Sequence, residues 1–148
     1  MTDKETVRLV VTRRLPFSAE RVFDAWLDPR VARRFLFATE NGQTVRAETD
    51  PRVGGRFTFV DRRDGADVEH TGEYLELDRP RRLVFTFLVP MYSTDAAIVE
   101  IDIARDGDGC VLTLRQEMAP EYADYKERSE QGWAMIVANL EKALAADE

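Results

Sequence analysis

The chain has 148 residues, of which 44% are hydrophobic, with one cysteine and a formal net charge of -7. This length and apolar content suffice for one core without disulfides or metals, so we expect residues 1–148 to form a single domain. An acidic chain lacks the basic face that nucleic acids and anionic membranes require. No apolar run is long enough for a signal peptide or a membrane span. We therefore expect a cytoplasmic protein that binds neither nucleic acid nor membrane.

The first predicted element is a strand over residues 7–15, in which Val7, Leu9 and Val11 alternate with outward-facing residues. Arg13 falls on the apolar side of this alternation. Either the strand bulges there, or the guanidinium points inward and needs an anionic partner. The alternative is an arginine that lies along the strand and reaches solvent or an acidic neighbour.

Two short helices are predicted after this strand. Ser18 is a typical N-cap for a helix over residues 19–26, which carries Trp26 inward. Asp28, followed by a proline, is typical of the start of a second helix over residues 29–36. The two helices interrupt the sheet after its first strand.

Beyond residue 42 the hydrophobic pattern has a period of two and predicts six further strands. The strand over residues 81–88 is apolar on both faces, so we expect it to be central and covered twice, or to lie at an interface. The loop over residues 89–95 is the longest break between strands and is predicted to form a pocket rim. The six strands are residues 44–49, 56–61, 68–78, 81–88, 96–105 and 110–118.

The chain closes with a predicted helix over residues 129–145. Its apolar residues form one wide stripe that must be buried against another element: Trp133, Ile136, Val137, Leu140 and Leu144. We therefore expect an α+β fold in which this helix packs in the concave face of a curved antiparallel sheet of about seven strands.

This order of elements is the helix-grip arrangement, and specific segments resemble a known family. The sequence is similar to the SRPBCC (START, birch-pollen-allergen, polyketide-cyclase) superfamily and, within it, to bacterial relatives of the C-terminal domain of the activator of the heat-shock-protein-90 ATPase. The segments include Val22-Phe23-Asp24-Ala25-Trp26, Val53-Gly54-Gly55-Arg56-Phe57, Gly72-Glu73-Tyr74 and Gly132-Trp133. All of them are structural motifs and none is a catalytic signature.

The resemblance implies a pocket between sheet and helix that binds lipids, hormones, polyketides or other apolar molecules. Gln116 stands where a histidine is common on the seventh strand, so no histidine-dependent role is implied there. Chaperone activation is not implied either, because the eukaryotic activator contacts its chaperone through a separate N-terminal domain.

Alternation along the strands and the stripe of the last helix predict which residues line this pocket. The structural alternative is that the same side chains simply fill the interior. The candidate ligand-binding residues are Arg13, Trp26, Phe57, Phe59, His70, Tyr74, Phe85, Val99, Ile101, Leu112, Trp133, Ile136 and Val137.

His70 is the only histidine, which excludes a multi-histidine metal site, and we expect no metal and no cofactor. With Tyr74 on the same strand face, it is a candidate general base or a hydrogen-bond partner for a ligand. The alternative is a histidine that is satisfied within the strand and performs no reaction. Cys110 is expected to be a small buried hydrophobe.

Three functions remain open. We favour a non-catalytic protein that holds a small apolar or amphipathic molecule between sheet and helix. The second is an enzyme of the cyclase or hydrolase type, in which His70, Tyr74, Arg13 or Glu73 polarises the ligand. The third is an interaction module of the chaperone-activator kind, which requires a filled core and an exposed apolar patch. A homodimer is compatible with each of them.

Overall fold

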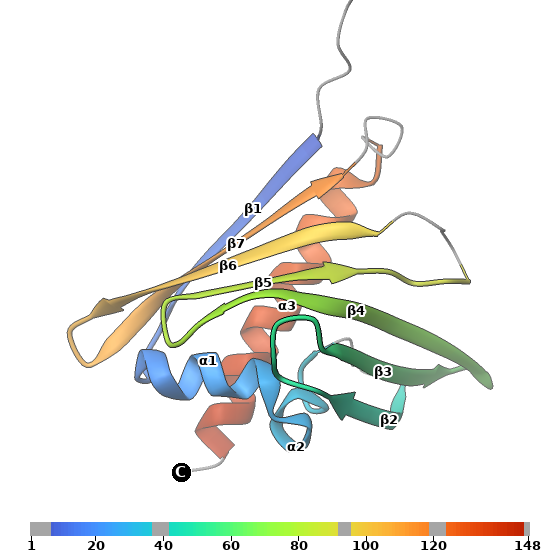
Figure 1. Cartoon of the computed structure of the whole chain (residues 1–148), viewed down its shortest axis with the longest axis horizontal. Helices are drawn as coiled ribbons and strands as arrows, with labels where there is room; N and C mark the ends of the chain where they lie inside the picture. The colour runs from blue at the N-terminus through green and yellow to red at the C-terminus, as the bar shows by residue number, and fades with distance from the viewer. Residues whose placement is uncertain (1–6, 37–41, 92–95, 119–123, 147–148) are drawn as a thin grey trace, which may run out of the picture.

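The computed structural model describes residues 7–36, 42–91, 96–118 and 124–146, and it has the predicted α+β helix-grip fold (Figure 1). Seven antiparallel strands form one curved sheet in the order β1-β7-β6-β5-β4-β3-β2. The elements are β1 (Val7–Leu15), α1 (Ala19–Leu27), α2 (Pro29–Ala32), β2 (Gln43–Thr49), β3 (Arg56–Arg63), β4 (Ala66–Asp78), β5 (Arg82–Phe87), β6 (Ala97–Asp106), β7 (Gly109–Met118) and α3 (Lys126–Ala146).

Strands β2 to β7 follow one another in space as they do in sequence, and β1 closes the order beside β7. The edges of the sheet are therefore β1 and β2, which are joined by α1 and α2. Strand β5 occupies the middle position, as its two apolar faces predict. No helix among the described residues is both long enough and apolar enough to span a membrane.

Both short helices start where the sequence predicts. The Ser18 Oγ accepts a hydrogen bond from the Arg21 backbone N–H at 3.2 Å, and the Asp28 Oδ1 accepts one from the Arg30 backbone N–H at 2.9 Å. Each cap satisfies a backbone donor that the first helical turn leaves without a partner.

The second helix is shorter than predicted. It ends at Ala32, whereas the sequence pattern extends it to residue 36. Beyond that point the backbone N–H groups of Phe35 and Leu36 both donate to the Ala32 carbonyl, so the chain continues as tight turns. Phe35 and Leu36 are nevertheless buried, which shows that the apolar pattern marked burial and not helix length.

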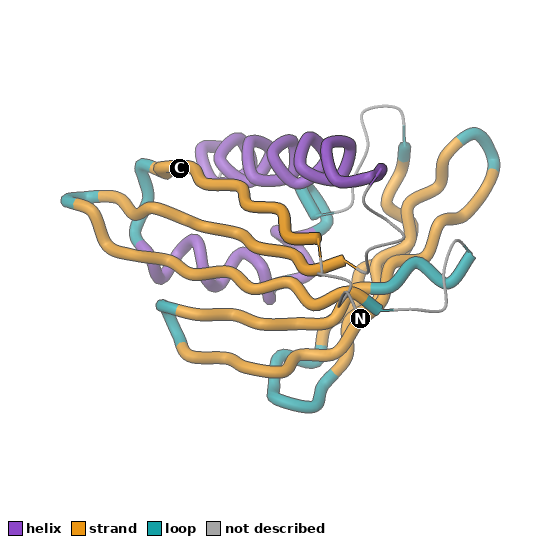
Figure 2. Tube along the Cα trace, turned by 90° about the horizontal axis from the view of Figure 1, so that it is seen from above, coloured by secondary structure: helices purple, strands orange, loops and turns teal. Residues whose placement is uncertain are grey.

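Helix α3 lies along one side of the sheet (Figure 2). We call the face of the sheet that packs against α3 the inner face and the opposite one the outer face. Side chains alternate between the two, as in any pleated strand. The buried cluster that joins α3 to the inner face includes Leu9, Phe57, Phe59, Leu83, Phe85, Val99, Ile101, Leu112, Leu114, Trp133, Val137, Leu140 and Leu144.

Helix α1 is tied to the C-terminal end of α3. The Arg21 guanidinium donates to the carbonyl of Leu144 at 3.0 Å and lies 4.9 Å from the centroid of the Phe17 ring. The carbonyls of a last helical turn carry partial negative charge, so a cation is favourable there. This contact closes the core at the end where α1 and α3 meet.

The turn before β3 requires both of its glycines, for different reasons. Gly54 has a φ of 87°, which side chains rarely tolerate. Gly55 has ordinary backbone angles, but a Cβ there would lie 2.0 Å from the Asp50 carbonyl oxygen. The paired glycines thus hold β2 and β3 in register.

Leu140 sits in the middle of the α3 contact and is fully buried, so Leu140→Ala should lower the free energy of unfolding by about 2–5 kcal/mol. Met135 on the same helix is exposed, so Met135→Ala is the matched control and should change stability by less than about 0.5 kcal/mol. Urea denaturation of the three proteins measures both effects. Equal losses for the two variants would show that α3 is not anchored through this face.

Candidate functional site

Most of the predicted ligand-binding residues lie together in the interior. Side chains on the inner face, on α1 and on α3 are buried where the pattern places them, while Ile136 is half-buried. Burial alone is compatible with lining a site or with filling the core. The predicted ligand-binding residues that are buried are Trp26, Phe57, Phe59, His70, Tyr74, Phe85, Val99, Ile101, Leu112, Trp133 and Val137.

Arg13 is the exception. Its side chain is 42% exposed, and its Nε donates to the Glu141 Oε1 of α3 at 3.0 Å. The alternation correctly assigned it to the α3 side, but β1 is an edge strand, so a long side chain there reaches the rim and not the interior. Arg13 is therefore no longer a candidate for binding a ligand inside the protein.

The centre of the inner face is filled by aromatic rings around Phe57. Its ring centroid lies 6.0 Å from that of Phe59, 5.6 Å from that of Tyr74 and 5.4 Å from that of Phe85. Only glycine fits at position 72, since a Cβ there would lie 1.8 Å from the Thr86 carbonyl oxygen and 2.6 Å from the Phe57 ring. Burial raises the pKa of the Tyr74 hydroxyl, with a smaller contribution from the Asp50 charge. This part of the interior is packed core.

Trp26 closes the α1 side of the same core. Its ring meets Phe35 edge to face, with the centroids 5.2 Å apart. The indole Nε1–H is buried and has no hydrogen-bond partner among the described residues. Trp26 is therefore a packing residue that also carries an unmatched donor.

A second arrangement runs across the inner face from β4 to β7, and we call it the interior row. The His70 ring is parallel to that of Phe87, with centroids 6.0 Å apart, and Phe87 meets Trp133 edge to face at 5.7 Å. The Trp133 Nε1–H donates to the Gln116 Oε1 at 2.5 Å. The row therefore joins three strands to α3 through two aromatic contacts and one buried hydrogen bond.

The Gln116 carboxamide has a defined orientation. An indole N–H can only donate, so the oxygen of the amide must face Trp133 and the NH₂ group must point elsewhere. Gln116 is 6% exposed, and its amide nitrogen makes no hydrogen bond within the described part of the chain. The fully buried side-chain polar atoms that lack a hydrogen-bond partner do not include this nitrogen, so the NH₂ group keeps some contact with solvent at the edge of the interior.

His70 also has a defined protonation state. Its Nδ1 lies 3.3 Å from the Phe59 carbonyl oxygen, which can only accept, so Nδ1 carries the hydrogen. Burial, with a smaller effect of the Arg63 charge, lowers the pKa of His70 to about 4. At neutral pH the ring is therefore uncharged, with its lone pair on Nε2.

Beside His70, a buried ion pair occupies the inner face of β3. Asp61 is 2% exposed, and its Oδ2 accepts a hydrogen bond from the Arg63 Nε at 2.7 Å. Asp61 follows Phe57 and Phe59 in the alternation, so its inward position could have been predicted from the sequence. The pair brings opposite charges together and leaves no net charge at this end of the row.

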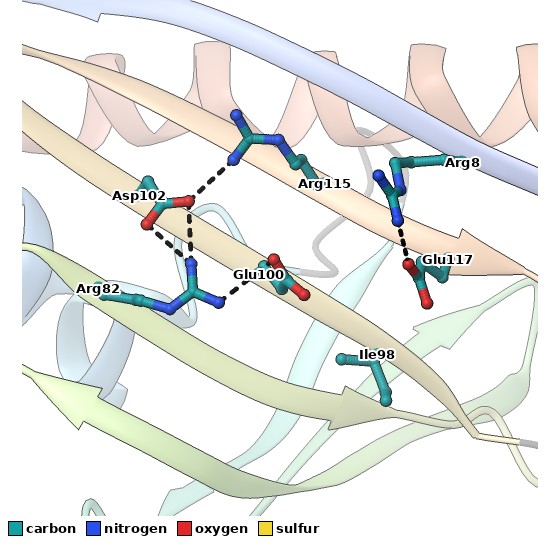
Figure 3. Close-up of a pocket in the computed structure, with 7 residues that line it drawn as sticks. All are labelled: Arg8, Arg82, Ile98, Glu100, Asp102, Arg115 and Glu117. Carbon is teal, nitrogen blue, oxygen red and sulfur yellow. Dashed lines mark hydrogen bonds and ion pairs between the residues drawn. The ribbon is translucent and has the colours of Figure 1, made fainter.

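The outer face carries a charged hollow of about 240 Å³ (Figure 3). Figure 3 shows Arg82 between Glu100 and Asp102, at 3.3 and 2.9 Å, with Arg115 reaching the same Asp102 at 2.8 Å. This network covers Val84, which is only 7% exposed although no helix packs on that side. The second apolar face of β5 is thus covered by arginine and carboxylate side chains.

Another hollow, of about 500 Å³, lies between α1, the turn before β5 and the β6–β7 hairpin. Neither hollow is lined by a predicted ligand-binding residue. The second is lined by Ala19, Pro80, Arg81, Asp102, Ile103, Ala104, Arg105, Val111 and Thr113.

Residues 16–145 match the family model of the Activator of Hsp90 ATPase homolog 1-like proteins. The chain belongs to this family. No curated protein sequence matches the chain significantly. The family agrees with the resemblance drawn from the sequence motifs, and it comprises domains of a ligand-binding or activator-like kind.

Solved structures similar to this chain have the same fold. Protein CV1439 from Chromobacterium violaceum is 27% identical, with 91% of this chain and 94% of that chain covered and a TM-score of 0.81. Protein NE0264 from Nitrosomonas europaea is 20% identical over 96% of both chains, with a TM-score of 0.83. The AHSA1-like protein from Aeromonas hydrophila is 22% identical over 95% and 94% of the two chains, with a TM-score of 0.82.

The four residues that the sequence offered for an enzyme do not converge on one point. Arg13 lies at the rim of β1, while Glu73 is half-buried and its carboxylate lies 4.0 Å from the Arg56 guanidinium. His70 is a poor base at neutral pH because of its lowered pKa, and Tyr74 lies within the aromatic core. Among residues 7–36, 42–91, 96–118 and 124–146, no group of three or more metal-ligating side chains is present.

The lowered pKa of His70 predicts a pH dependence of stability. Below about pH 6.5 the unfolded chain binds a proton that folded His70 does not bind until about pH 4, so acidification favours unfolding across this window. His70 should account for a loss of about 3 kcal/mol between pH 7 and pH 4. Denaturant titrations at both pH values, on the wild type and on His70→Gln, measure this loss. An equal loss in both proteins would contradict the prediction.

Proposed function

We propose that the protein binds a small apolar or amphipathic molecule at the interior row, between the inner face of the sheet and α3. The observation that carries this proposal is the Gln116 carboxamide, which is almost fully buried and offers an NH₂ group with no partner among the described residues. A hydrogen-bond acceptor on a bound molecule would satisfy it. This nitrogen is not fully buried, so water can satisfy it in the free protein, and an acceptor on a ligand would take the place of that water.

The surroundings of Gln116 fit an apolar body. Phe87 and Ile136 are only partly buried although both pack against the core, and they border Trp133 in the row and on α3. Apolar walls with a few placed polar groups are typical of small-molecule sites. The centre of the core, by contrast, consists of fully buried side chains such as Leu112 and Leu140. The proposed site is therefore the end of the interior nearest Trp133.

The chaperone-activator alternative has less support. An interaction module of that kind requires a contiguous apolar patch, and no helix or strand of the described chain presents more than one exposed large hydrophobic residue. The exposed large hydrophobic residues are Val10, Val45, Val53, Leu75, Met91, Ile98, Tyr125 and Met135.

The proposal is tested with N-phenylnaphthylamine, a neutral probe whose fluorescence rises in apolar surroundings. Trp133→Ala removes a wall of the site and should weaken binding of the probe by at least about tenfold, since a buried aromatic contact is lost. Leu140→Ala acts in the packed core, so at a temperature where it is folded it should bind within about twofold of the wild type.

Native mass spectrometry of the purified protein is the complementary measurement, because it detects a retained small molecule. If the probe does not bind the wild type, or if the two variants lose binding equally, the interior row has no ligand-binding role.

A further inference from the structure

We infer that the interior row selects a neutral molecule bearing an oxygen acceptor, such as a ketone, which takes a hydrogen bond from the Gln116 NH₂ group, and that it rejects an ionised carboxylate. This inference rests on the proposed function and specifies the chemistry of its ligand. It assigns Gln116, which lines neither of the two hollows described above, as the specificity-determining residue.

The first argument is the direction of the Gln116 amide. Trp133 occupies the amide oxygen, so the group that remains can only donate. The position of the Trp133 ring is fixed by the packing of α3, since this ring also contacts Phe87 and is only 4% exposed. The amide therefore cannot rotate to present its oxygen without leaving the indole N–H unpaired. A ligand group that accepts hydrogen bonds is favoured over one that donates them.

The second argument concerns positive charge. Three arginines occupy inward positions of the described strands, and each is bonded to a carboxylate: Arg13 to Glu141, Arg63 to Asp61 and Arg105 to Glu20. The remaining basic group on the inner face, His70, is uncharged at neutral pH for the reasons given above.

An ionised carboxylate entering the row would lose its hydration without gaining a cation. Buried anions require a charged or multiply hydrogen-bonded partner, and one amide NH₂ group does not replace a hydration shell. A carbonyl oxygen loses far less hydration and is satisfied by one or two hydrogen bonds. The row is therefore matched to a neutral acceptor.

Three naphthalenes of nearly equal shape separate these contributions: acetylnaphthalene, ethylnaphthalene and naphthoate. They share one apolar body and differ in the acceptor and the charge. Binding of each is measured by isothermal titration calorimetry at pH 7.5 to the wild type and to Gln116→Met, which keeps the volume of the side chain and removes its donor.

We expect Gln116→Met to weaken binding of acetylnaphthalene by about tenfold, the effect of one hydrogen bond, and to leave ethylnaphthalene unchanged or tighter. Because ethylnaphthalene needs no donor, its binding also shows that the variant keeps a folded site. Naphthoate should bind the wild type at least about a hundredfold more weakly than acetylnaphthalene. The matched control is Glu117→Met, the next residue of β7, whose side chain lies on the outer face and which should leave all three affinities unchanged.

The outcomes distinguish this inference from the proposed function. If acetylnaphthalene and ethylnaphthalene bind but Gln116→Met affects both alike, or if naphthoate binds as tightly as the ketone, the inference fails while the binding site stands. If none of the three binds the wild type, the proposed function itself fails.

Discussion

The burial of one face of α3 against the inner face of the curved sheet is the constraint on which the rest of the structure depends. A helix as long as α3 with a wide apolar stripe cannot remain in water, and alternating strands supply the surface that receives it. Leu140 and Val137 make the centre of this contact and are fully buried. Arg21 fastens its C-terminal end by donating to the Leu144 carbonyl. Once α3 is fixed in this way, the position of Trp133 relative to β7 is fixed as well.

That position gives the interior two regions of different character. Around Phe57 the rings are closely packed, and Gly72 leaves room for the Phe57 ring and for the Thr86 carbonyl. Toward Trp133, Phe87 and Ile136 are only partly buried, and the polar side chains of Gln116 and His70 enter the apolar interior. Polar groups in a core reduce stability unless they are fully paired, and both regions hold some: the Tyr74 hydroxyl and the unmatched Trp26 Nε1–H border the packed rings, while Gln116 and His70 lie in the interior row. On the outer face, the arginines of the charged hollow each have a carboxylate partner.

The fold followed from the sequence because a period of two and a period of 3.6 dictate which side chains share a face. The same alternation placed Phe57 and His70 inside. For Arg13 it gave the correct face but not the distance from the sheet edge, so the choice between an inward guanidinium and one paired with an acidic neighbour needed the structure, which shows the pair with Glu141. Gln116 carried a signal, a polar residue at an inward position two residues beyond Leu114, yet its role depends on the rotation of α3 about its axis. The alternation of strand residues gives no information about that rotation, so the hydrogen bond between Gln116 and Trp133 could not be predicted from the sequence.

The central claim is that Gln116 and Trp133 together form the part of the interior that meets a ligand. The most direct test is a ¹H–¹⁵N correlation spectrum of the protein titrated with acetylnaphthalene, in which the Gln116 side-chain NH₂ and the two indole N–H groups give separate signals. The account predicts that the Gln116 and Trp133 signals shift together and saturate at one ligand per chain, while the Trp26 indole signal moves little. Saturation with the Gln116 and Trp133 signals unmoved, or shifts confined to the arginine Nε–H groups of the outer face, would contradict it.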